Sequence, residues 1–262
     1  MPEQKGTRSL ERAFQLLRLL AAAGARGASP AELAQACDCS RPTLYRLLQA
    51  LRRQGCVRPA PTRGRYQLGY ELFALGVHAG NASGLRERAR PALLRLAQRF
   101  GDSFFLLVAD GSQVLCLDML AGEQPVQSYS GTVGGRIPMG VGQASQVLLA
   151  QMSRAEATRI LRHNQAVLRL DYGLDSEMIA ASLASVRRLG FASGLPDRRL
   201  PGYTGLAVPI VDAAGELLGA FSCALARPRM SETRRQALAQ AMQLEAAALA
   251  RPAPDRRSGF GG

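Results

Sequence analysis

Two short helical segments follow each other closely between residues 29 and 55, in the stretch SPAELAQACDCSRPTLYRLLQALRRQG. The first opens with an N-cap serine, a proline at the first helical position and a glutamate that completes an S-x-x-E capping box: Ser29, Pro30 and Glu32. The helical pattern breaks at Asp38-Cys39, resumes with Ser40 as the next N-cap and ends at Gly55. Two helices joined by a turn of about three residues predict a helix-turn-helix.

A helix before this motif and a hairpin after it complete a small domain. Residues 9–24 carry apolar side chains at near-helical spacing, with Ser9 as the expected N-cap. The residues expected to face the core are Leu10, Phe14, Leu17, Leu20 and Ala21. After the third helix, CVRPAPTRGRYQLG indicates two short strands, the second over residues 65–68, joined by a turn with prolines and a glycine. This hairpin predicts a wing.

Positive charge is concentrated in the first quarter of the chain. Residues 1–65 carry 12 basic and 4 acidic side chains, whereas residues 66–250 carry 18 basic and 15 acidic ones. A generally arginine-rich composition would explain the net charge of +13 but not its uneven distribution. The asymmetry therefore favours a polyanion-binding module at the N-terminal end, with nucleic acid as its partner.

The third helix and the wing supply the candidate DNA contacts. Side chains near the start of a recognition helix reach base edges in the major groove, and those beside the cap also contact phosphates. The helix candidates are Ser40, Arg41, Thr43, Tyr45, Arg46 and Gln49. On the wing, we expect Arg63 and Arg65 to enter a minor groove or clamp the backbone. The alternative is a small helical domain with a solvated arginine face, which the charge asymmetry disfavours.

Three cysteines lie in or near the predicted motif, at Cys37, Cys39 and Cys56. A structural zinc site takes four ligands, commonly as paired C-x-x-C, but the spacing here is C-x-C and no histidine precedes His78. We therefore expect no bound metal. Cys37 is predicted to be a small buried residue. Cys39 is predicted to lie in an exposed turn beside Arg41, where a redox role stays open.

The sequence contains no signal for a membrane span, for secretion or for catalysis. No apolar run approaches about 18 residues, and the N-terminus lacks an apolar core region, so we expect a cytoplasmic protein with reduced cysteines. The motifs G-x-S-x-G, P-loop and H-E-x-x-H are absent, so we expect no enzyme activity, no catalytic residue and no cofactor. The alternative is a thiol enzyme that uses Cys116 or Cys223, although both lie in predicted strands, where a buried thiol is inert.

Strand pairs and helices fill the remaining three quarters of the chain. Strands at 104–110 and 113–119 predict one hairpin, and strands within 202–212 and 216–225 predict another. Helices are expected at about 142–151, 154–163, 175–189 and 231–250. Paired strands with helices grouped between them predict an antiparallel sheet covered by helices, so the whole chain is expected to be α/β (α+β).

These segments together resemble the IclR family of bacterial transcriptional regulators. In the N-terminal part the resemblance rests on SLERA at 9–13, the helix pair with TLYRLL, and the GRYQLG wing. Further on it rests on GGRIPMGVGQASQVLLAQM at 134–152, VRRLGFA at 186–192 and GLAVPIVDAAGELLGAFSC at 205–223. It extends from Ser9 to about Leu249.

The resemblance implies a domain order. We expect a flexible N-terminus (1–8), a winged helix-turn-helix (9–69), a linker helix (70–84), a GAF-like effector-binding domain (85–250) and a disordered tail (251–262). The linker helix offers Leu72, Leu75 and Val77 for dimer packing. The resemblance further implies dimers or dimers of dimers that bind palindromic double-stranded DNA. Such proteins regulate catabolic operons in response to small organic or aromatic acids. The alternative is a regulator whose C-terminal domain serves only dimerisation.

The resemblance also implies an effector site against the sheet, where a helix N-terminus can receive a carboxylate. Carried over position by position, the implied contacts are Met139, Gln143, Ala144, Ser145, Gly205 and Ser222. Tyr129 and Tyr203 are expected as aromatic walls, and Asp197 as the nearest match to an acidic residue before the strand. Members that bind glyoxylate-like acids have a cysteine at the position of Gly205 and a serine at that of Ala224, and the loop usually has a basic residue where this chain has Gln146. These departures predict a roomier, less polar pocket for an aromatic or larger acid.

Overall fold

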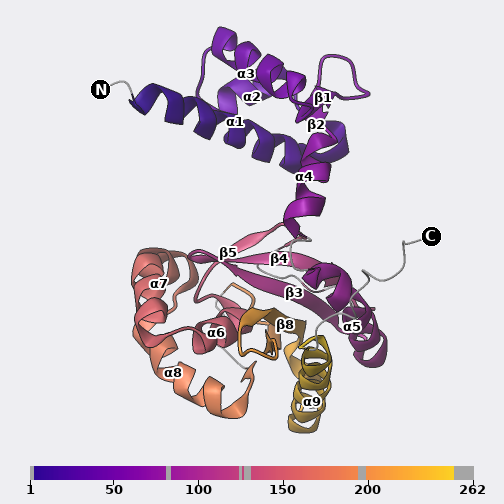
Figure 1. The fold of residues 1–262 in the computed structure, drawn as a ribbon, viewed down its shortest axis with the longest axis vertical. Coiled ribbons are helices and arrows are strands. Elements are labelled where there is room, and N and C mark those ends of the chain that lie inside the picture. Colours follow the sequence, from indigo (N-terminus) through magenta and orange to yellow (C-terminus); the bar gives the residue numbers. More distant parts are fainter. Residues whose placement is uncertain (1–2, 81–83, 124–125, 127–130, 194–198, 251–262) are drawn as a thin grey trace, which may run out of the picture. The chain divides into compact units, whose positions relative to one another are not determined.

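The structure, a computed structural model, describes residues 3–80, 84–123, 126, 131–193 and 199–250 (Figure 1). It divides into two compact units, Met1–Ala82 and Ser83–Gly262, and each unit is described by itself. Tyr129, Asp197 and the expected tail at 251–262 lie outside the described residues. Among the described helices, none has the length and apolar character needed to cross a membrane.

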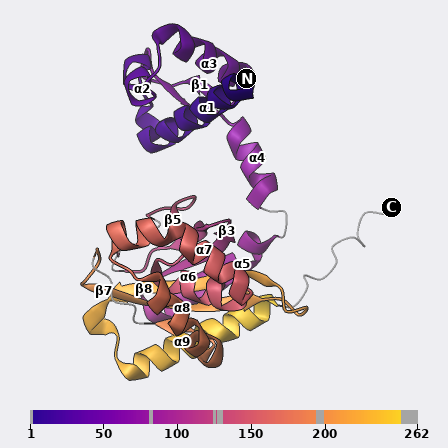
Figure 2. The same ribbon diagram turned by 90° about the vertical axis from the view of Figure 1, so that its left-hand side faces the viewer.

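The first unit is a winged helix-turn-helix followed by one more helix. Its elements are α1 (Glu3–Ala23), the short 3-10 turn η1 (Gly24–Arg26), α2 (Pro30–Ala36), α3 (Arg41–Arg53), β1 (Val57–Pro59), β2 (Tyr66–Leu68) and α4 (Glu71–Gly80). In Figure 2, α1, α2 and α3 form one compact group. Its core consists chiefly of Leu16, Leu20, Leu33, Leu44, Leu48 and Val57, all buried. The capping box at Ser29 and Glu32 is confirmed, because both of its hydrogen bonds are present.

Helix α1 differs from the expected helix in its start and in its buried face. It begins at Glu3 rather than at Ser9, so Ser9 lies inside the helix and does not cap it. The buried residues are Leu16 and Leu20, whereas Leu10 is 60% exposed and Phe14 is 52% exposed. The helix carries two overlapping apolar stripes at 3.6-residue spacing, and only packing against α2 and α3 selects one of them. The expected core positions of Leu10, Phe14 and Ala21 were therefore wrong.

Side chains of α1 donate hydrogen bonds to the turn between α2 and α3. Asp38 adopts a φ of 44°, a left-handed conformation that aspartate tolerates better than most residues. The Arg12 guanidinium donates to the carbonyl of Asp38 at 3.3 Å, and the Gln15 amide donates to the carbonyl of Ala36 at 3.0 Å. These bonds satisfy carbonyls that α2 leaves unpaired where it ends. The angle between the two helices of the motif is thus fixed partly by α1.

The second unit is a six-stranded antiparallel sheet with helices on both faces. The strand order is β5-β4-β3-β8-β7-β6, and the strands span Ser103–Asp110 (β3), Gln113–Leu120 (β4), Arg136–Pro138 (β5), Ala192–Ser193 (β6), Tyr203–Val211 (β7) and Leu217–Ala226 (β8). The two predicted hairpins are confirmed as β3–β4 and β7–β8. They join through pairing of β3 with β8, between segments more than 100 residues apart.

Alternation along the strands divides the core of this unit into two layers. Phe104 and Leu106 face helices α5 (Leu85–Phe100) and α9 (Glu232–Leu249). Phe105 and Leu107 face α6 (Gly142–Gln151), α7 (Arg154–Val167) and α8 (Ser176–Leu189). Figure 1 shows this separation, with α6, α7 and α8 on one side of the strands and α5 and α9 on the other. The predicted α/β (α+β) class with an antiparallel sheet is confirmed.

Helix α5 and the short strands β5 and β6 were not predicted. Helix α5 contains Pro91, which normally interrupts a helix, yet it buries a face of Leu85, Ala89, Ala92, Leu93 and Leu96. Helix α7 extends to Val167 and continues into one π-helical turn at Leu168–Tyr172, beyond the expected end at 163. The short 3-10 turn η3 (Arg227–Arg229) precedes α9.

Buried carboxylates join the helices of the second unit to the sheet. Asp102 is fully buried and binds Arg229 at 2.8 Å and Arg234 at 2.7 Å. Asp118 accepts two hydrogen bonds from Arg90, at 2.9 and 2.8 Å. Many arginines of this unit therefore form ion pairs within the protein. An exposed arginine without such a pair is a candidate for binding an external anion.

Candidate functional site

The exposed face of α3 carries most of the predicted DNA contacts. Arg41, Arg46 and Gln49 are exposed, and the Tyr45 ring is 46% exposed, while Leu44 and Leu48 on the opposite face are buried. The burial pattern follows directly from the helical period, because the apolar stripe is held by α1 and α2. The helix therefore presents a polar and cationic surface of a kind that a major groove accepts.

Ser40 and Thr43 form a pair at the start of this helix. Ser40 occupies the N-cap position in extended conformation, as expected, but its side chain caps no backbone amide. Its hydroxyl lies 3.0 Å from that of Thr43, which is half-buried. Backbone N–H groups of the first turn of α3 thus lack a side-chain cap, so this helix end can receive a phosphate.

The two wing arginines have different environments. Arg63 is exposed in the turn between β1 and β2. The Arg65 side chain is 20% exposed and binds the Glu32 carboxylate at 2.6 Å. It also donates to the carbonyl of Gly27, with Nη2 at 3.1 Å and Nε at 3.2 Å. Arg63 fits the expected role in DNA contact, whereas the contacts of Arg65 point into the protein and argue against that expectation.

Two further arginines extend the cationic surface of α3 and were not predicted. Arg52 and Arg53 are exposed in its last turn. The cationic set of the first unit comprises Arg41, Arg46, Arg52, Arg53 and Arg63. None of these five side chains forms an ion pair with any residue that the structure describes. Their place in a basic helix end was a usable signal, because phosphate contacts often lie outside the base-reading residues.

Large apolar side chains are exposed on α1 and α4. On α1 these are Leu10 and Phe14; on α4 and just before it they are Tyr70, Phe73, Leu75 and Val77. Phe73 is 73% exposed and was not predicted, whereas the expected Leu72 is half-buried. Exposed apolar side chains in this number are more typical of a protein-contact surface than of the surface of an isolated monomer.

The predicted effector residues converge in part, between the start of α6 and the face of the sheet beneath it. Gly205 on β7 and Ser222 on β8 share a face with Ala207, Ala220 and Ala224. A Cβ at position 205 would lie 3.2 Å from the Gln143 Oε1, so Gln143 reaches across to this strand. Tyr203 is half-buried on the same face, at the start of β7. The side chains on this face of the central strands are small, and Ala207, Ala220 and Ser222 are buried.

Met139 and Ser145 serve mainly as structural residues. Met139 is fully buried in the layer between the sheet and α6–α8. The Ser145 hydroxyl donates to the carbonyl of Val141 at 2.6 Å, within its own helix. Helix α6 has no side-chain cap at its N-terminus, so its first N–H groups are free to bind a carboxylate.

One buried polar pair near this site was not assigned from the sequence. Gln146 is 4% exposed, and its amide donates to the Ser182 hydroxyl on α8 at 3.3 Å. Gln146 stands directly before the apolar residues 147–150 of α6, and this position was the available signal.

Asn164 joins α7 to the segment that leads into α6. Its amide nitrogen donates to the carbonyl of Ser112 at 2.7 Å and to the carbonyl of Met139 at 2.9 Å. Next to Met139, Gly140 packs tightly under Leu168, where a Cβ would come within 2.8 Å of the leucine. This clamp fixes the backbone just before α6.

Three of the five cysteines, Cys37, Cys116 and Cys223, are buried, and Cys39 and Cys56 are half-buried. Burial raises the pKa of Cys223 to about 12, so its thiol stays protonated near neutral pH. Cys116 is buried and donates to the carbonyl of Asp118. Cys37 is buried as expected, and burial raises its pKa. Cys39 is half-buried against the winged-helix core, so the expected exposed turn was wrong for this side chain. In the described part of the chain, no group of three or more possible metal ligands occurs.

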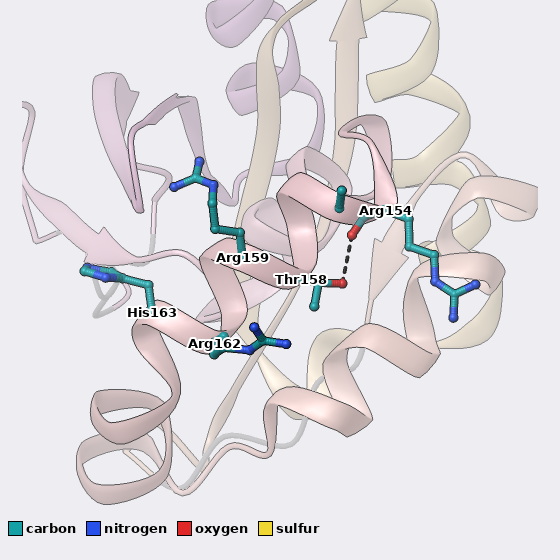
Figure 3. A pocket seen from close by; sticks show the side chains of 6 residues that line it. Arg154, Thr158, Arg159, Arg162 and His163 are labelled. Atoms are coloured by element: carbon teal, nitrogen blue, oxygen red, sulfur yellow. Dashed lines mark hydrogen bonds between the residues drawn. The ribbon is translucent and has the colours of Figure 1, made fainter.

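A second basic face lies on α7, away from the predicted effector residues. Figure 3 shows Arg154, Arg159, Arg162 and His163 along the outer side of this helix. The Thr158 hydroxyl between them donates to the carbonyl of Arg154 at 2.8 Å. Within the described ranges, the side chains of the three arginines form no ion pair. Arginines without an ion pair therefore also occur in the second unit.

Two family models match the chain. The model described as "Bacterial transcriptional regulator IclR C-terminal" matches residues 77–251, and the "IclR helix-turn-helix domain" matches residues 9–61. The chain is 31% identical to the HTH-type transcriptional regulator BhcR of Paracoccus denitrificans, over 92% of this chain and 85% of that protein. It is 26% identical to the transcriptional repressor IclR of Escherichia coli, over 89% of this chain and 85% of that one.

Solved structures share the fold. An IclR transcriptional regulator from Alicyclobacillus acidocaldarius superposes with a TM-score of 0.76 at 22% identity, covering 92% of this chain and 97% of that one. An IclR homologue from Microbacterium hydrocarbonoxydans, complexed with 4-hydroxybenzoate, gives a TM-score of 0.76 at 22% identity, covering 94% of this chain and 99% of that one.

Proposed function

Because the chain belongs to the IclR family of DNA-binding transcriptional regulators, we propose that it binds a palindromic operator as a homo-oligomer and controls a catabolic operon in the cytoplasm. We further propose that a small organic or aromatic acid, bound in the second unit, changes its affinity for that operator. The ligand acts through a difference in affinity for two arrangements of the protein.

The observation that carries the DNA-binding proposal is the set of unpaired arginines on α3 and the wing. Most of the ion-paired arginines lie in the second unit, whereas the exposed ones of the first unit have no acidic partner among the described residues. Keeping several like charges on one surface is unfavourable unless an anion binds there. In the proposed complex, Arg46 and its neighbours on α3 read bases, and the outer arginines contact phosphates.

The exposed apolar side chains on α1 and α4 support oligomerisation. Phe14 and Phe73 are each more than half exposed, and burial of either ring against another chain would lower the free energy. Two copies joined here would present two α3 helices to successive major grooves, as a palindromic operator requires. Sedimentation velocity of the wild-type chain and of Phe73→Ser tests this. A variant that sediments like the wild type contradicts the assigned surface.

The effector proposal rests on the small side chains beneath the start of α6. Gly205, Ala207 and Ala224 have small side chains on the face of the sheet beside the N-terminus of α6, which has no side-chain cap. A ring can lie on such a surface while its carboxylate accepts from the free N–H groups. The complex of the Microbacterium homologue with 4-hydroxybenzoate is consistent with an aromatic acid as the ligand class.

Thermal unfolding against a panel of aromatic and aliphatic acids, with 4-hydroxybenzoate included, tests the effector proposal. A specific ligand at about 100 times its dissociation constant adds about 2.7 kcal/mol to the stability of the state that binds it. Gln143→Ala should reduce the shift, because its amide lies at the proposed site. Gln165→Ala, an exposed position on α7, is the matched control. If no acid shifts the transition, the second unit serves only dimerisation.

A further inference from the structure

We propose that Arg65 is a positioning residue, which with Glu32 holds the wing in the place where Arg63 meets the DNA backbone. This inference rests on the proposed DNA-binding function and names a division of labour between the two wing arginines. Arg63 contacts DNA, and Arg65 fixes the hairpin that carries it.

The contacts of Arg65 tie the wing to the segment in front of α2. Its Nη2 lies 2.6 Å from the Glu32 Oε2 and 3.1 Å from the Gly27 carbonyl. Its Nε lies 3.2 Å from the carbonyls of both Gly27 and Arg26. One edge of the guanidinium is thus filled by three acceptors of the protein. A phosphate that displaced them would leave the Glu32 carboxylate without its cation.

Glu32 is held in place independently of Arg65. Its Oε2 also accepts from the backbone N–H of Ser29 at 2.8 Å, as the second half of the capping box. The Ser29 amide and Arg65 together lower the pKa of this carboxyl from 4.5 to about 2. The carboxylate therefore remains ionised at all ordinary pH values, and the wing is anchored to the first turn of α2.

Backbone pairing beside Arg65 makes this anchor rigid. Ala28 and Tyr66 exchange two hydrogen bonds, both of 2.9 Å, and form an isolated antiparallel bridge between the wing and the residue before Ser29. The approach is close at Gly27, which has a φ of 64° and where a Cβ would lie 2.4 Å from the Tyr66 carbonyl oxygen. The residue before Tyr66 is Arg65, so its side chain and the main-chain bridge hold the same point of the hairpin.

The wing turn is closed by bonds that end at Arg65. The N–H of Ala60 donates to the carbonyl of Arg65 at 2.8 Å, and the N–H of Arg65 donates to the carbonyl of Thr62 at 3.2 Å. Arg63 lies inside this closed turn and is exposed. A shift of Arg65 therefore moves Arg63 relative to α3, which packs against the same α2.

The substitution Glu32→Gln separates positioning from direct contact, because the two predict opposite signs. Glutamine still completes an S-x-x-Q capping box, so α2 remains capped. The substitution removes a negative charge beside the DNA surface and releases Arg65. If Arg65 bound phosphate, or had no role, affinity for DNA would stay the same or rise. If Arg65 positions the wing, affinity falls.

The assay is fluorescence anisotropy with a labelled palindromic duplex, selected from a random-sequence library by the wild-type chain, over a series of salt concentrations. We expect Glu32→Gln to lower affinity about three- to tenfold, the scale of one weakened charged hydrogen bond. The slope of the logarithm of the binding constant against the logarithm of the salt concentration should become shallower by up to about 0.9 per wing, because Arg63 loses its phosphate contact. Arg65→Lys keeps the positive charge but loses the planar guanidinium that donates to several acceptors at once, so it should lower affinity for DNA by a similar factor.

The double variant Arg63→Gln with Glu32→Gln supplies a measurement that general destabilisation would not affect. If Glu32 acts through the position of Arg63, the two losses are not additive, and the double variant binds about as well as Arg63→Gln alone. Arg162→Gln on α7 removes one unpaired arginine outside the wing and controls for the total charge. Circular dichroism checks that every variant is folded at the assay temperature.

The outcomes distinguish this inference from the proposed function. Equal or tighter binding by Glu32→Gln, or additive losses in the double variant, would overturn the positioning role while leaving DNA binding intact. A wild-type chain that selects no duplex would overturn the proposed function and this inference with it. Weaker binding with non-additive losses supports both.

Discussion

Replacing Asn164 by alanine tests the clamp that holds the segment before α6. The side chain is 5% exposed, and its amide nitrogen serves the carbonyls of Ser112 and Met139 at 2.7 and 2.9 Å. Alanine leaves the Met139 carbonyl without this donor, at a cost of about 1–3 kcal/mol for a buried polar group that loses its partner. The Ser112 carbonyl also loses the bond but keeps the N–H of Met139 at 2.9 Å, so this loss costs about 1 kcal/mol. The total should therefore be about 2–4 kcal/mol.

Calorimetry of the full chain measures this cost through the transition of the second unit. For a domain of this size, each kcal/mol corresponds to about 2–4 °C, so we expect the midpoint to fall by about 5–15 °C. The next residue, Gln165, is exposed, and Gln165→Ala should change the midpoint by little. If Asn164→Ala costs no more than Gln165→Ala, the clamp does not stabilise the unit and the reasoning is refuted.

Asn164→Asp gives the same clamp a pH dependence. The carboxyl group that this substitution creates would face two carbonyl oxygens in a buried site, so its pKa in the folded state is raised above the unfolded value of about 3.9. The charged form is then disfavoured in the folded state. The variant should therefore lose stability relative to wild type as pH rises above about 4, and recover it as pH falls. A difference independent of pH would contradict this.

Three further outcomes follow from single contacts. Arg46→Ala should weaken specific binding by about 1–3 kcal/mol and relax sequence discrimination; an unchanged ratio of operator to random DNA contradicts base reading. The Glu32 carboxylate stabilises the fold above its ordinary pKa of 4.5, and this contribution is lost as pH falls toward about 2. Melting points of wild type and Glu32→Gln should therefore converge over that range, and a constant gap would count against the ion pair. Gly205→Ala places a Cβ 2.3 Å from the Cys223 carbonyl oxygen and should cost about 1–3 kcal/mol, whereas Gly202→Ala, with no atom within 4 Å, should be neutral.

Local chemistry was sufficient to locate the elements that begin and end with capping or turn residues. The box at Ser29 and Glu32 predicted the start of α2, and the structure shows both of its hydrogen bonds. The Gly111-Ser112 pair between two apolar runs predicted the β3–β4 hairpin. In such places the determining interactions lie within a few residues of one another, so that the sequence alone contains them.

Local sequence could not predict which face of α1 is buried, or that α5 forms. In α1 two apolar stripes are equally compatible with the helical period, and contact with α2 and α3 decides that Leu16 is buried while Phe14 is exposed. Helix α5 contains Pro91, which cannot donate a helical hydrogen bond, and burial of Leu93 and its neighbours between the sheet and α9 outweighs that local cost.

The roles of the two wing arginines show the same limit at the level of function. By itself, the sequence predicted a basic winged helix-turn-helix and an antiparallel sheet covered by helices, because these depend on periodicity, caps and charge. The linker helix and the effector role were expected from the family resemblance. It did not distinguish Arg63 from Arg65, since both are arginines of one hairpin. Only the tertiary structure brings Glu32, 33 residues away in sequence, to within 2.6 Å of Arg65 and leaves Arg63 exposed. The energy of an ion pair depends on distance in space, and that distance is set by the folded chain.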